Sequence, residues 1–262
     1  MKRKSMFVYH GNKNRVVPKI RSISHLGIKR VVEPFLGSGA YSIAQGLPAI
    51  GYEINERLCN VWRWLQNCTP EDLFDLEARY IASFEGGKNL KVRIDDCGYS
   101  QPEADYVRLQ CGGLVPGSLK NNLTYWNQKG NRHRSLAITG TINCLEAIRN
   151  IEVRCEDGHS HVVEDGDLLF VDPPYIGTQA AYISSKGDPT KLYDPQKTID
   201  LINSTSNPTI ITYGERAEEI FPDFRWEVLT QTLSPNVYNP SKRRWKNEMI
   251  AYINFPERFS LG

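Results

Sequence analysis

Short apolar runs alternate with amphipathic segments over much of the chain. Each run is a few residues long and ends at a charged or turn-forming residue, a pattern typical of strands buried on both faces. The predicted strands lie at residues 30–33, 49–52, 147–148, 151–153, 168–171, 209–213, 227–229 and 249–253. The predicted helices lie at residues 16–25, 40–45, 57–66 and 196–203. This alternation predicts an α/β fold with a doubly wound, mostly parallel sheet covered by helices on both sides.

The alternation lapses in the middle of the chain. Between about residue 69 and residue 150, turn-forming pairs at Gly86-Gly87, Gly112-Gly113 and Pro116-Gly117 divide the sequence into short elements. We therefore predict a small inserted domain at 67–145, and a main domain formed by 1–66 and 146–262.

The composition is that of a chain that can bury a full core. Its 262 residues are 40% apolar and 24% charged, which suits one globular unit, with or without an insertion. In the helix predicted at 57–66, Leu58, Val61, Trp62 and Leu65 recur at helical spacing, so we expect them in the core and not at a ligand.

Cysteine usage and charge add two expectations. The six cysteines form no C-x-x-C pair, and no apolar run has the length of a membrane span or a secretion signal, so we expect reduced thiols in a cytoplasmic protein. The formal charge of +2 is unevenly distributed: residues 71–105 hold nine acidic and four basic residues, whereas 117–135 hold four basic residues and no acidic one. This asymmetry predicts a basic face set apart from an acidic one.

The tetrapeptide Asp172-Pro173-Pro174-Tyr175 follows the apolar run 168–171 and carries the most specific chemistry. Two prolines cannot continue a paired strand, because proline has no amide hydrogen and restricts its predecessor. The chain must leave the sheet there and present the Asp172 carboxylate and the Pro173 carbonyl as acceptors beside the Tyr175 ring. Two acceptors and a stacking plate suit the exocyclic amine of a base, because they can turn its nitrogen toward an electrophilic methyl group.

A second motif predicts a cofactor site. The segment 30–42 is typical of a strand, a tight glycine turn and a helix start, and Gly37 and Gly39 allow the backbone to approach a ligand closely. The next strand ends before Glu53, and a carboxylate at that place suits the hydroxyls of a ribose. Alone, the glycine turn is equally typical of an ordinary connection. With Glu53 and Asp172-Pro173-Pro174-Tyr175 following in this order, it indicates an adenosine cofactor.

In these motifs the chain resembles the Dam-like N6-adenine DNA methyltransferases of the D12 class. The matching segments are 9–13 with 16–20, 33–39, 53–55, 172–175 and 243–250, with Asn12 in place of the family's second glycine. The resemblance is thin from about residue 58 to residue 150, so it implies no recognition sequence. It does imply a sheet of the Rossmann-like methyltransferase type, S-adenosylmethionine as cofactor, double-stranded DNA as substrate and an inserted domain that recognises the target.

The resemblance and the motifs together nominate two sets of residues. The catalytic set is Asp172, Pro173, Pro174 and Tyr175, and the cofactor-binding set is Tyr9, Lys13, Phe35, Gly37, Ser38, Gly39, Glu53, Asp157 and Asp172. Lys13 suits a cofactor or a DNA contact. Asp157 lies where the family has a polar residue near the cofactor's adenine, although Glu156 and Asp165 fit that place equally well.

Basic residues interleaved with amides and aromatic rings predict the DNA contacts. Lys and Arg suit phosphates, amides suit base edges, and a ring can fill the gap left by a flipped base. The predicted residues are Lys120, Asn122, Tyr125, Trp126, Lys129, Arg132 and Arg134, with Arg243 and Arg244 in a second cluster. A solvated loop is the alternative for either segment. His159-Ser160-His161 lacks a matching Cys or His pair, so we predict a surface turn, and no metal is needed for methyl transfer.

The predicted function is transfer of a methyl group from S-adenosylmethionine to adenine N6 in DNA, with the base flipped out. Cytosine N4 methylation needs the same amine geometry, and an RNA methyltransferase or an inactive DNA-binding relative is a further alternative. The intact Asp172-Pro173-Pro174-Tyr175 argues against the inactive relative, and RNA enzymes more often have an amide at that Asp. The oligomeric state is open, and a monomer is compatible with the sequence.

Overall fold

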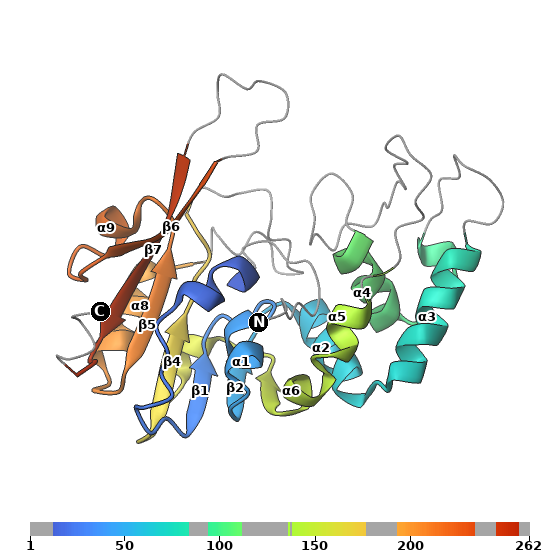
Figure 1. Cartoon of the computed structure of the whole chain (residues 1–262), viewed down its shortest axis with the longest axis horizontal. Coiled ribbons are helices and arrows are strands. Elements are labelled where there is room, and N and C mark those ends of the chain that lie inside the picture. Colours follow the sequence, from blue (N-terminus) through green and yellow to red (C-terminus); the bar gives the residue numbers. More distant parts are fainter. Residues whose placement is uncertain are drawn as a thin grey trace.

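The computed structural model describes residues 13–83, 94–111, 136, 138–176, 193–233 and 245–256. Its described strands form one sheet of seven in the order β3-β2-β1-β4-β5-β7-β6 (Figure 1). The neighbours from β3 to β5 run parallel, whereas β7 is antiparallel to both β5 and β6. The strands are β1 Arg30–Glu33, β2 Ala49–Tyr52, β3 Ile151–Arg154, β4 Asp167–Val171, β5 Thr209–Tyr213, β6 Glu227–Leu233 and β7 Trp245–Ile253.

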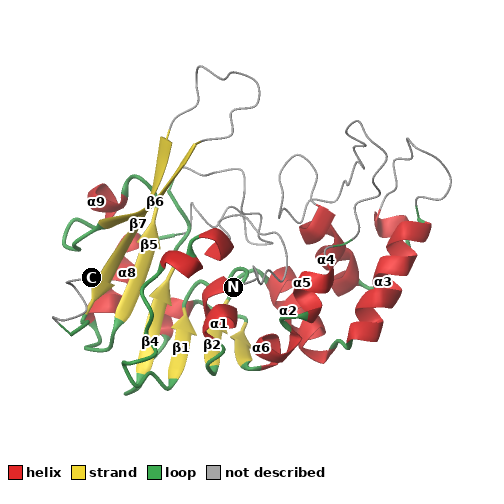
Figure 2. Ribbon diagram, in the orientation of Figure 1, coloured by secondary structure: helices red, strands yellow, loops and turns green. Residues whose placement is uncertain are grey.

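Most of the helices come between these strands in the sequence (Figure 2). The α-helices are α1 Ala40–Gln45, α2 Glu56–Asn67, α3 Pro70–Ala82, α4 Gln101–Cys111, α5 Ile138–Ile142, α6 Leu145–Arg149, α8 Pro195–Asn203 and α9 Ala217–Ile220. Four short 3-10 helices are η1 Lys13–Arg15, η2 Val17–Lys19, η3 Ile94–Asp96 and η4 Gly158–Ser160. None of the described helices combines the length and apolarity that a membrane crossing requires.

Two predicted elements are wrong. In place of the helix predicted at 16–25 the described chain has only the short η2, because Pro18 cannot donate a helical hydrogen bond and the backbone at Ile20 is already extended, with φ −70° and ψ 138°. The strand predicted at 147–148 is part of α6, in which Leu145 and Ile148 are buried one turn apart. An apolar pair of that length fits either period.

The sheet is covered on both faces, as predicted. Along β4, Leu168 and Phe170 face a core shared with α1 and α2, while Leu169 and Val171 face a second core shared with α8 and α9. The alternation follows from the pleat, which points successive side chains to opposite faces. All four of these side chains are buried, so β4 delivers the chain to Asp172 from the centre of the molecule.

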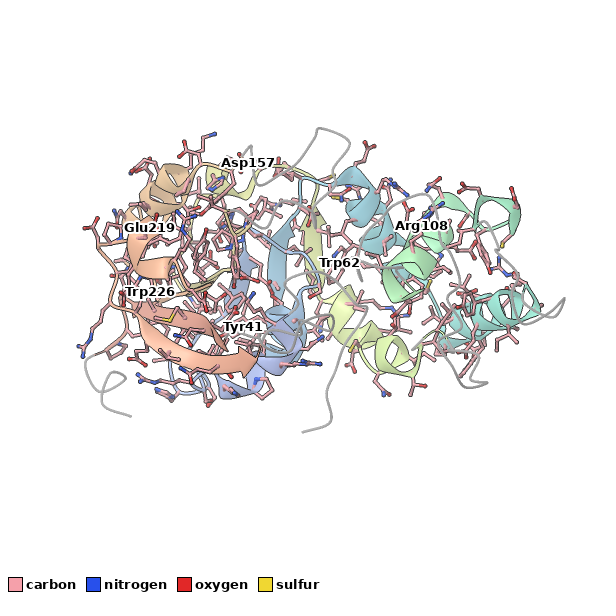
Figure 3. The ribbon with its side chains drawn as sticks, turned by 90° about the horizontal axis from the view of Figure 1, so that it is seen from above. Tyr41, Trp62, Arg108, Asp157, Glu219 and Trp226 are labelled. Atoms are coloured by element: carbon pink, nitrogen blue, oxygen red, sulfur yellow. The ribbon has the colours of Figure 1, made fainter. Side chains whose placement is uncertain are left out.

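Helix α2 joins the sheet to the helices from the middle of the chain. Leu58, Val61, Trp62 and Leu65 are fully buried, which confirms the predicted core face. The buried apolar residues of α3, α4 and α5 belong to the same core cluster as these four side chains. Figure 3 places Trp62 between the sheet and these helices. The boundaries of the inserted domain stay a prediction.

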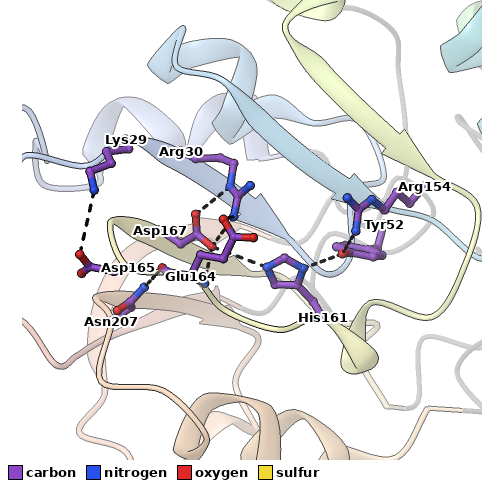
Figure 4. A network of polar contacts seen from close by, with 9 residues as sticks. All are labelled: Lys29, Arg30, Tyr52, Arg154, His161, Glu164, Asp165, Asp167 and Asn207. Carbon is purple, nitrogen blue, oxygen red and sulfur yellow. Dashed lines mark hydrogen bonds and ion pairs between the residues drawn. The ribbon is translucent and has the colours of Figure 1, made fainter.

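A polar network links residues of β1, β2 and β4 on the face of the sheet away from α2 (Figure 4). The guanidinium of Arg30 on β1 donates to both carboxylate oxygens of Asp167 on β4, over 2.7 and 2.8 Å. His161 Nδ1 lies 2.6 Å from the Tyr52 hydroxyl, and its Nε2 lies 3.6 Å from Asp167 Oδ2, too far for a hydrogen bond. The turn predicted for His159-Ser160-His161 is present as η4 with Ser160 exposed, but the side chains of His159 and His161 are only 13% and 5% exposed.

Candidate active site

The predicted motifs meet at one edge of the sheet. Strands β1, β2, β4 and β5 are parallel, so their carboxyl ends point the same way. Glu33 ends β1, Glu53 follows β2, and Asp172 follows β4. Ligands of open parallel sheets bind outside these strand ends. The fold thus brings together residues that lie more than a hundred positions apart in the sequence.

Asp172 is held by a lysine and a threonine. Lys13 Nζ lies 2.8 Å from Asp172 Oδ1, and the Thr212 hydroxyl on β5 donates to the same oxygen over 3.0 Å. Burial raises the pKa of the Asp172 carboxyl to about 6, the charge of Lys13 opposes the rise, and the charge of Glu248 adds to it. Among the described residues, no hydrogen bond to Asp172 Oδ2 is found. This second oxygen is therefore the one that can accept a hydrogen from a ligand.

The Tyr175 ring and this carboxylate both lie next to the ammonium of Lys13. After Val171 the chain leaves the sheet through Pro173 and Pro174, as predicted, and Tyr175 packs against Tyr213 with 4.7 Å between ring centroids. A side chain on Gly214 would lie 3.2 Å from the Tyr175 ring, so the glycine leaves room for it. The Tyr175 hydroxyl donates to Glu248 Oε1, and Lys13 Nζ lies 5.1 Å from the centre of the ring.

The glycine turn after β1 has a left-handed backbone. Gly37 and Gly39 have φ angles of 48° and 56°, which glycine adopts without strain. Trp62 Nε1 donates to the Gly37 carbonyl over 3.0 Å, and a Cβ on Gly39 would lie 2.7 Å from the Trp62 ring. Ser38 in the same turn is buried. Helix α2 therefore stabilises the conformation of the turn through Trp62.

Glu53 lies against the glycine turn. Its carboxylate accepts a hydrogen bond from the Asn55 amide over 2.9 Å, and backbone amides of Gly37 and Ile54 also stabilise its charge. Burial outweighs these bonds and raises the pKa of Glu53 to about 7. The glycine turn and the Glu53 carboxylate are therefore in direct contact, and their role as an adenosine site stays a prediction.

Phe35 and the loop that starts at Asp157 pack against each other next to the glycine turn. The Phe35 ring lies 5.2 Å from the ring of His159 and 5.8 Å from that of Tyr193. Asp157 begins η4, accepts from the His159 amide over 3.1 Å, and lies 2.6 Å from His159 Nδ1. A Cβ on Gly158 would lie 2.4 Å from the Pro34 carbonyl oxygen, so this loop packs tightly on the segment before the turn.

Several predicted residues lie outside the described part of the chain. They are Tyr9 and the DNA-binding candidates Lys120, Asn122, Tyr125, Trp126, Lys129, Arg132, Arg134, Arg243 and Arg244. Their roles stay predictions. Within the described ranges, no group of three or more Cys, His, Asp or Glu side chains has an arrangement suited to a metal ion.

Four residues at the site were not predicted as site residues. Glu248 contacts Lys13 and Tyr175, Thr212 contacts Asp172, and the Tyr213 hydroxyl accepts from the Ile176 amide over 2.9 Å. Glu33 accepts from the Ser42 amide over 2.8 Å, and burial raises its pKa to about 8. Only Glu33 and Glu248 gave a signal, since both lie in motifs that carried the resemblance. Thr212 and Tyr213 sit in an apolar strand pattern that predicts core.

Comparisons with known proteins agree with this geometry. The chain is 24% identical to the type II methyltransferase M1.LlaDCHI of Lactococcus lactis subsp. cremoris, over 88% of this chain and 89% of that protein. The sequence model of the D12 class N6 adenine-specific DNA methyltransferases matches residues 9–233, which include the glycine turn, Glu53 and Asp172 to Tyr175. The chain belongs to the D12 class of N6 adenine-specific DNA methyltransferases.

Proposed function

We propose that this adenine-specific DNA methyltransferase takes its methyl group from S-adenosylmethionine and holds a flipped adenine between Asp172, Pro173 and Tyr175. The observation that carries the proposal is the fixed Asp172 carboxylate, whose Oδ1 is held by Lys13 and Thr212 beside an aromatic ring. When bound, S-adenosylmethionine supplies an electrophilic methyl group.

The residues at the strand ends fit an adenosine group with a charged tail. The left-handed turn at Gly37 and Gly39 brings backbone close to a ligand without side chains, and a Cβ at Gly39 has no room. Glu53 offers carboxylate oxygens where a ribose would present two hydroxyls. Phe35 and Asp157 line the side of the turn where the adenine would lie.

The acceptors prepare the target amine. The nitrogen lone pair of adenine N6 is delocalised into the ring, so hydrogen bonds to Asp172 Oδ2 and the Pro173 carbonyl would turn it toward the methyl group. The Tyr175 ring would stack on the flipped base and hold its plane. Asp172 need not remove a proton before attack, because the methylated ammonium can lose its proton afterwards. Position therefore matters more here than base strength.

The remaining parts of the proposal rest on the sequence. The basic segment 117–135 would contact the DNA backbone, with Tyr125 or Trp126 filling the space of the flipped base. Arg243 and Arg244 would add backbone contacts. A DNA substrate and the absence of a membrane-spanning helix among the described residues agree with work in the cytoplasm.

Replacing Asp172 tests the proposed mechanism. Asp172→Ala should lower methyl transfer by about a hundredfold or more, because the carboxylate oxygen that would accept from the amine is lost, while cofactor and DNA affinity stay within several-fold of the wild type. Asp172→Asn should also be severely impaired, since an amide offers only one oxygen. Asp223→Ala is the matched control, because that aspartate is exposed and outside the site.

The labelled base identifies the product. DNA methylated with a labelled cofactor should yield N6-methyladenine after digestion to nucleosides and mass spectrometry. N4-methylcytosine instead would contradict the adenine assignment. Wild-type turnover in Asp172→Ala would contradict the role of Asp172, whichever base is methylated.

A further inference from the structure

We propose that Glu248 on β7 is a positioning residue that couples the acceptor carboxylate of Asp172 to the stacking ring of Tyr175. The inference rests on the roles proposed above for these two residues. It assigns a role to a strand that comes after both motifs in the sequence and belongs to the antiparallel part of the sheet.

One oxygen of Glu248 serves two partners. Glu248 Oε1 lies 3.2 Å from Lys13 Nζ and accepts from the Tyr175 hydroxyl. Lys13 in turn lies 2.8 Å from Asp172 Oδ1. A continuous chain of polar contacts thus runs from the Tyr175 hydroxyl through Glu248 and Lys13 to Asp172.

The charges in this series of polar contacts explain how Lys13 is held in its buried position. Lys13 is 5% exposed, and a buried ammonium needs compensating charge. Burial lowers the pKa of Lys13, but the carboxylates of Asp172 and Glu248 outweigh it and raise the pKa above its ordinary value. Without Glu248, Asp172 would be the single described carboxylate in contact with this cation, and the hold on Lys13 would weaken.

The consequence for the reaction is geometric. Lys13 and Thr212 both hold Asp172 Oδ1, which leaves Oδ2 directed at the amine. Glu248 fixes the position of the Lys13 ammonium. Through its hydrogen bond with the Tyr175 hydroxyl, it also fixes the position of the ring on which the base stacks. The carboxylate and the ring are therefore set relative to each other by one side chain, and losing it should disturb the angle between the amine and its acceptor.

A double-mutant cycle measures this coupling. Tyr175→Phe removes the hydroxyl and keeps the ring, whereas Glu248→Ala removes the carboxylate. Each should lower kcat, Glu248→Ala by roughly 10- to 100-fold, the equivalent of one lost charged hydrogen bond. The double variant should be no slower than Glu248→Ala, because the hydroxyl has then already lost its partner. Effects that multiply would overturn the proposal.

The pH dependence of kcat/KM separates positioning from a loss of folded protein. The groups that face Asp172 are Lys13 from η1, Glu248 from β7, Thr212 from β5 and Glu33 from β1. Activity should fall as the pH drops through about 6, where Asp172 becomes protonated. Glu248→Gln removes a neighbouring negative charge, so its acid limb should move to lower pH. Lys13→Met removes a positive charge, so its limb should move to higher pH.

Glu227→Gln is the control, because Glu227 lies on the adjacent strand β6 and pairs with Arg21 away from the site. It should match the wild type in kcat and in the acid limb. Cofactor affinity, measured by calorimetry, should change by less than about threefold in Glu248→Gln, since the cofactor turn is not touched. An acid limb that stays in place in both Glu248→Gln and Lys13→Met would overturn the inference. If Asp172→Ala is inactive and the Glu248 variants match the wild type, only the inference about Glu248 fails.

Discussion

At the scale of single residues, burial sets the properties of three carboxyl groups at the edge of the sheet. The pKa values of Glu33, Glu53 and Asp172 are raised to about 8, 7 and 6, each chiefly by burial. They differ in what opposes it. Glu33 and Glu53 receive hydrogen bonds from amides, whereas Asp172 also has the full charge of Lys13. The charge of Lys13 limits the rise in the pKa of Asp172, because a cation compensates a buried carboxylate better than amide dipoles do.

Glu33 should therefore make stability depend on pH. Its pKa is about 8 in the folded protein and near its ordinary value of 4.5 when unfolded. The folded state binds the extra proton between these values, so the contribution of Glu33 to stability should be most favourable below pH 4.5 and fall as the pH rises toward 8. Glu33→Gln keeps an acceptor for the Ser42 amide and cannot ionise. It should be more stable than the wild type at pH 9 by on the order of a few kcal/mol.

Thermal unfolding of both proteins at pH 5 and pH 9 checks this expectation. The difference between them should shrink at pH 5, where Glu33 is protonated in the folded protein, so the lower pH is an internal control. An advantage of the variant that is equal at both pH values would show that burial does not raise the pKa of Glu33 into this range.

At the scale of elements, the sequence predicts those helices and strands whose apolar residues recur with a regular period. The bounds 40–45 of α1 and 49–52 of β2 are confirmed, whereas α2 is longer than predicted by one residue at each end and α8 by one residue at its start. The carboxyl ends of the strands locate Glu53 and Asp172 because parallel strands share an edge. Contacts from other strands could not be predicted. Thr212 reaches Asp172 across β4 and β5, and Glu248 depends on the register of β7, which no local pattern specifies.

The two glycines at the ends of α1 give a matched pair of substitutions. Gly39 and Gly46 flank α1, and both have positive φ, of 56° and 68°. A Cβ at Gly39 would lie 2.7 Å from Trp62, whereas at Gly46 it would meet nothing within 4 Å. Gly46→Ala should cost only the backbone strain, about 1–2 kcal/mol. Gly39→Ala should cost that strain plus about 1–3 kcal/mol for the displaced ring.

Cofactor affinity should separate the two variants further. Gly39→Ala should weaken S-adenosylmethionine binding, because moving Trp62 shifts the Gly37 carbonyl that its Nε1 holds. Gly46→Ala should bind with wild-type affinity. Chemical denaturation and calorimetry give both quantities, and equal affinity in the two variants would remove the turn from the cofactor site.

At the scale of the whole molecule, α3, α4 and α5 lie to one side of the sheet (Figure 1), and the basic segment 117–135 comes between α4 and α5 in the sequence. Arg57 at the start of α2 donates to Asp105 on α4 over 2.9 Å, and Arg108 donates to the same carboxylate over 2.7 Å. The Tyr106 hydroxyl lies 2.7 Å from the Thr141 hydroxyl, which joins α4 to α5. These contacts are buried or partly buried, so the two ends of the segment between α4 and α5 are anchored in the core.

Because those anchors do not involve the basic residues of 117–135, DNA affinity and cofactor affinity should respond separately to mutation. Replacing Lys129, Arg132 and Arg134 together by Ala should weaken duplex binding and flatten its dependence on salt. Each lost phosphate contact should remove about one unit from the slope of log affinity against log salt. S-adenosylmethionine affinity should stay the same. Binding titrations at several salt concentrations measure the slope, and calorimetry measures the cofactor.

The matched control removes three positive charges from the acid-rich stretch, as Lys88→Ala, Lys91→Ala and Arg93→Ala combined. Both triple variants change the net charge equally, so any effect of overall charge on DNA binding is common to them. A flatter slope confined to the first variant would support a local contact surface. Equal losses would show that only net charge matters. If the first variant kept the wild-type slope, the backbone contacts would have to come from elsewhere, and Arg243 and Arg244 would be the next residues to replace.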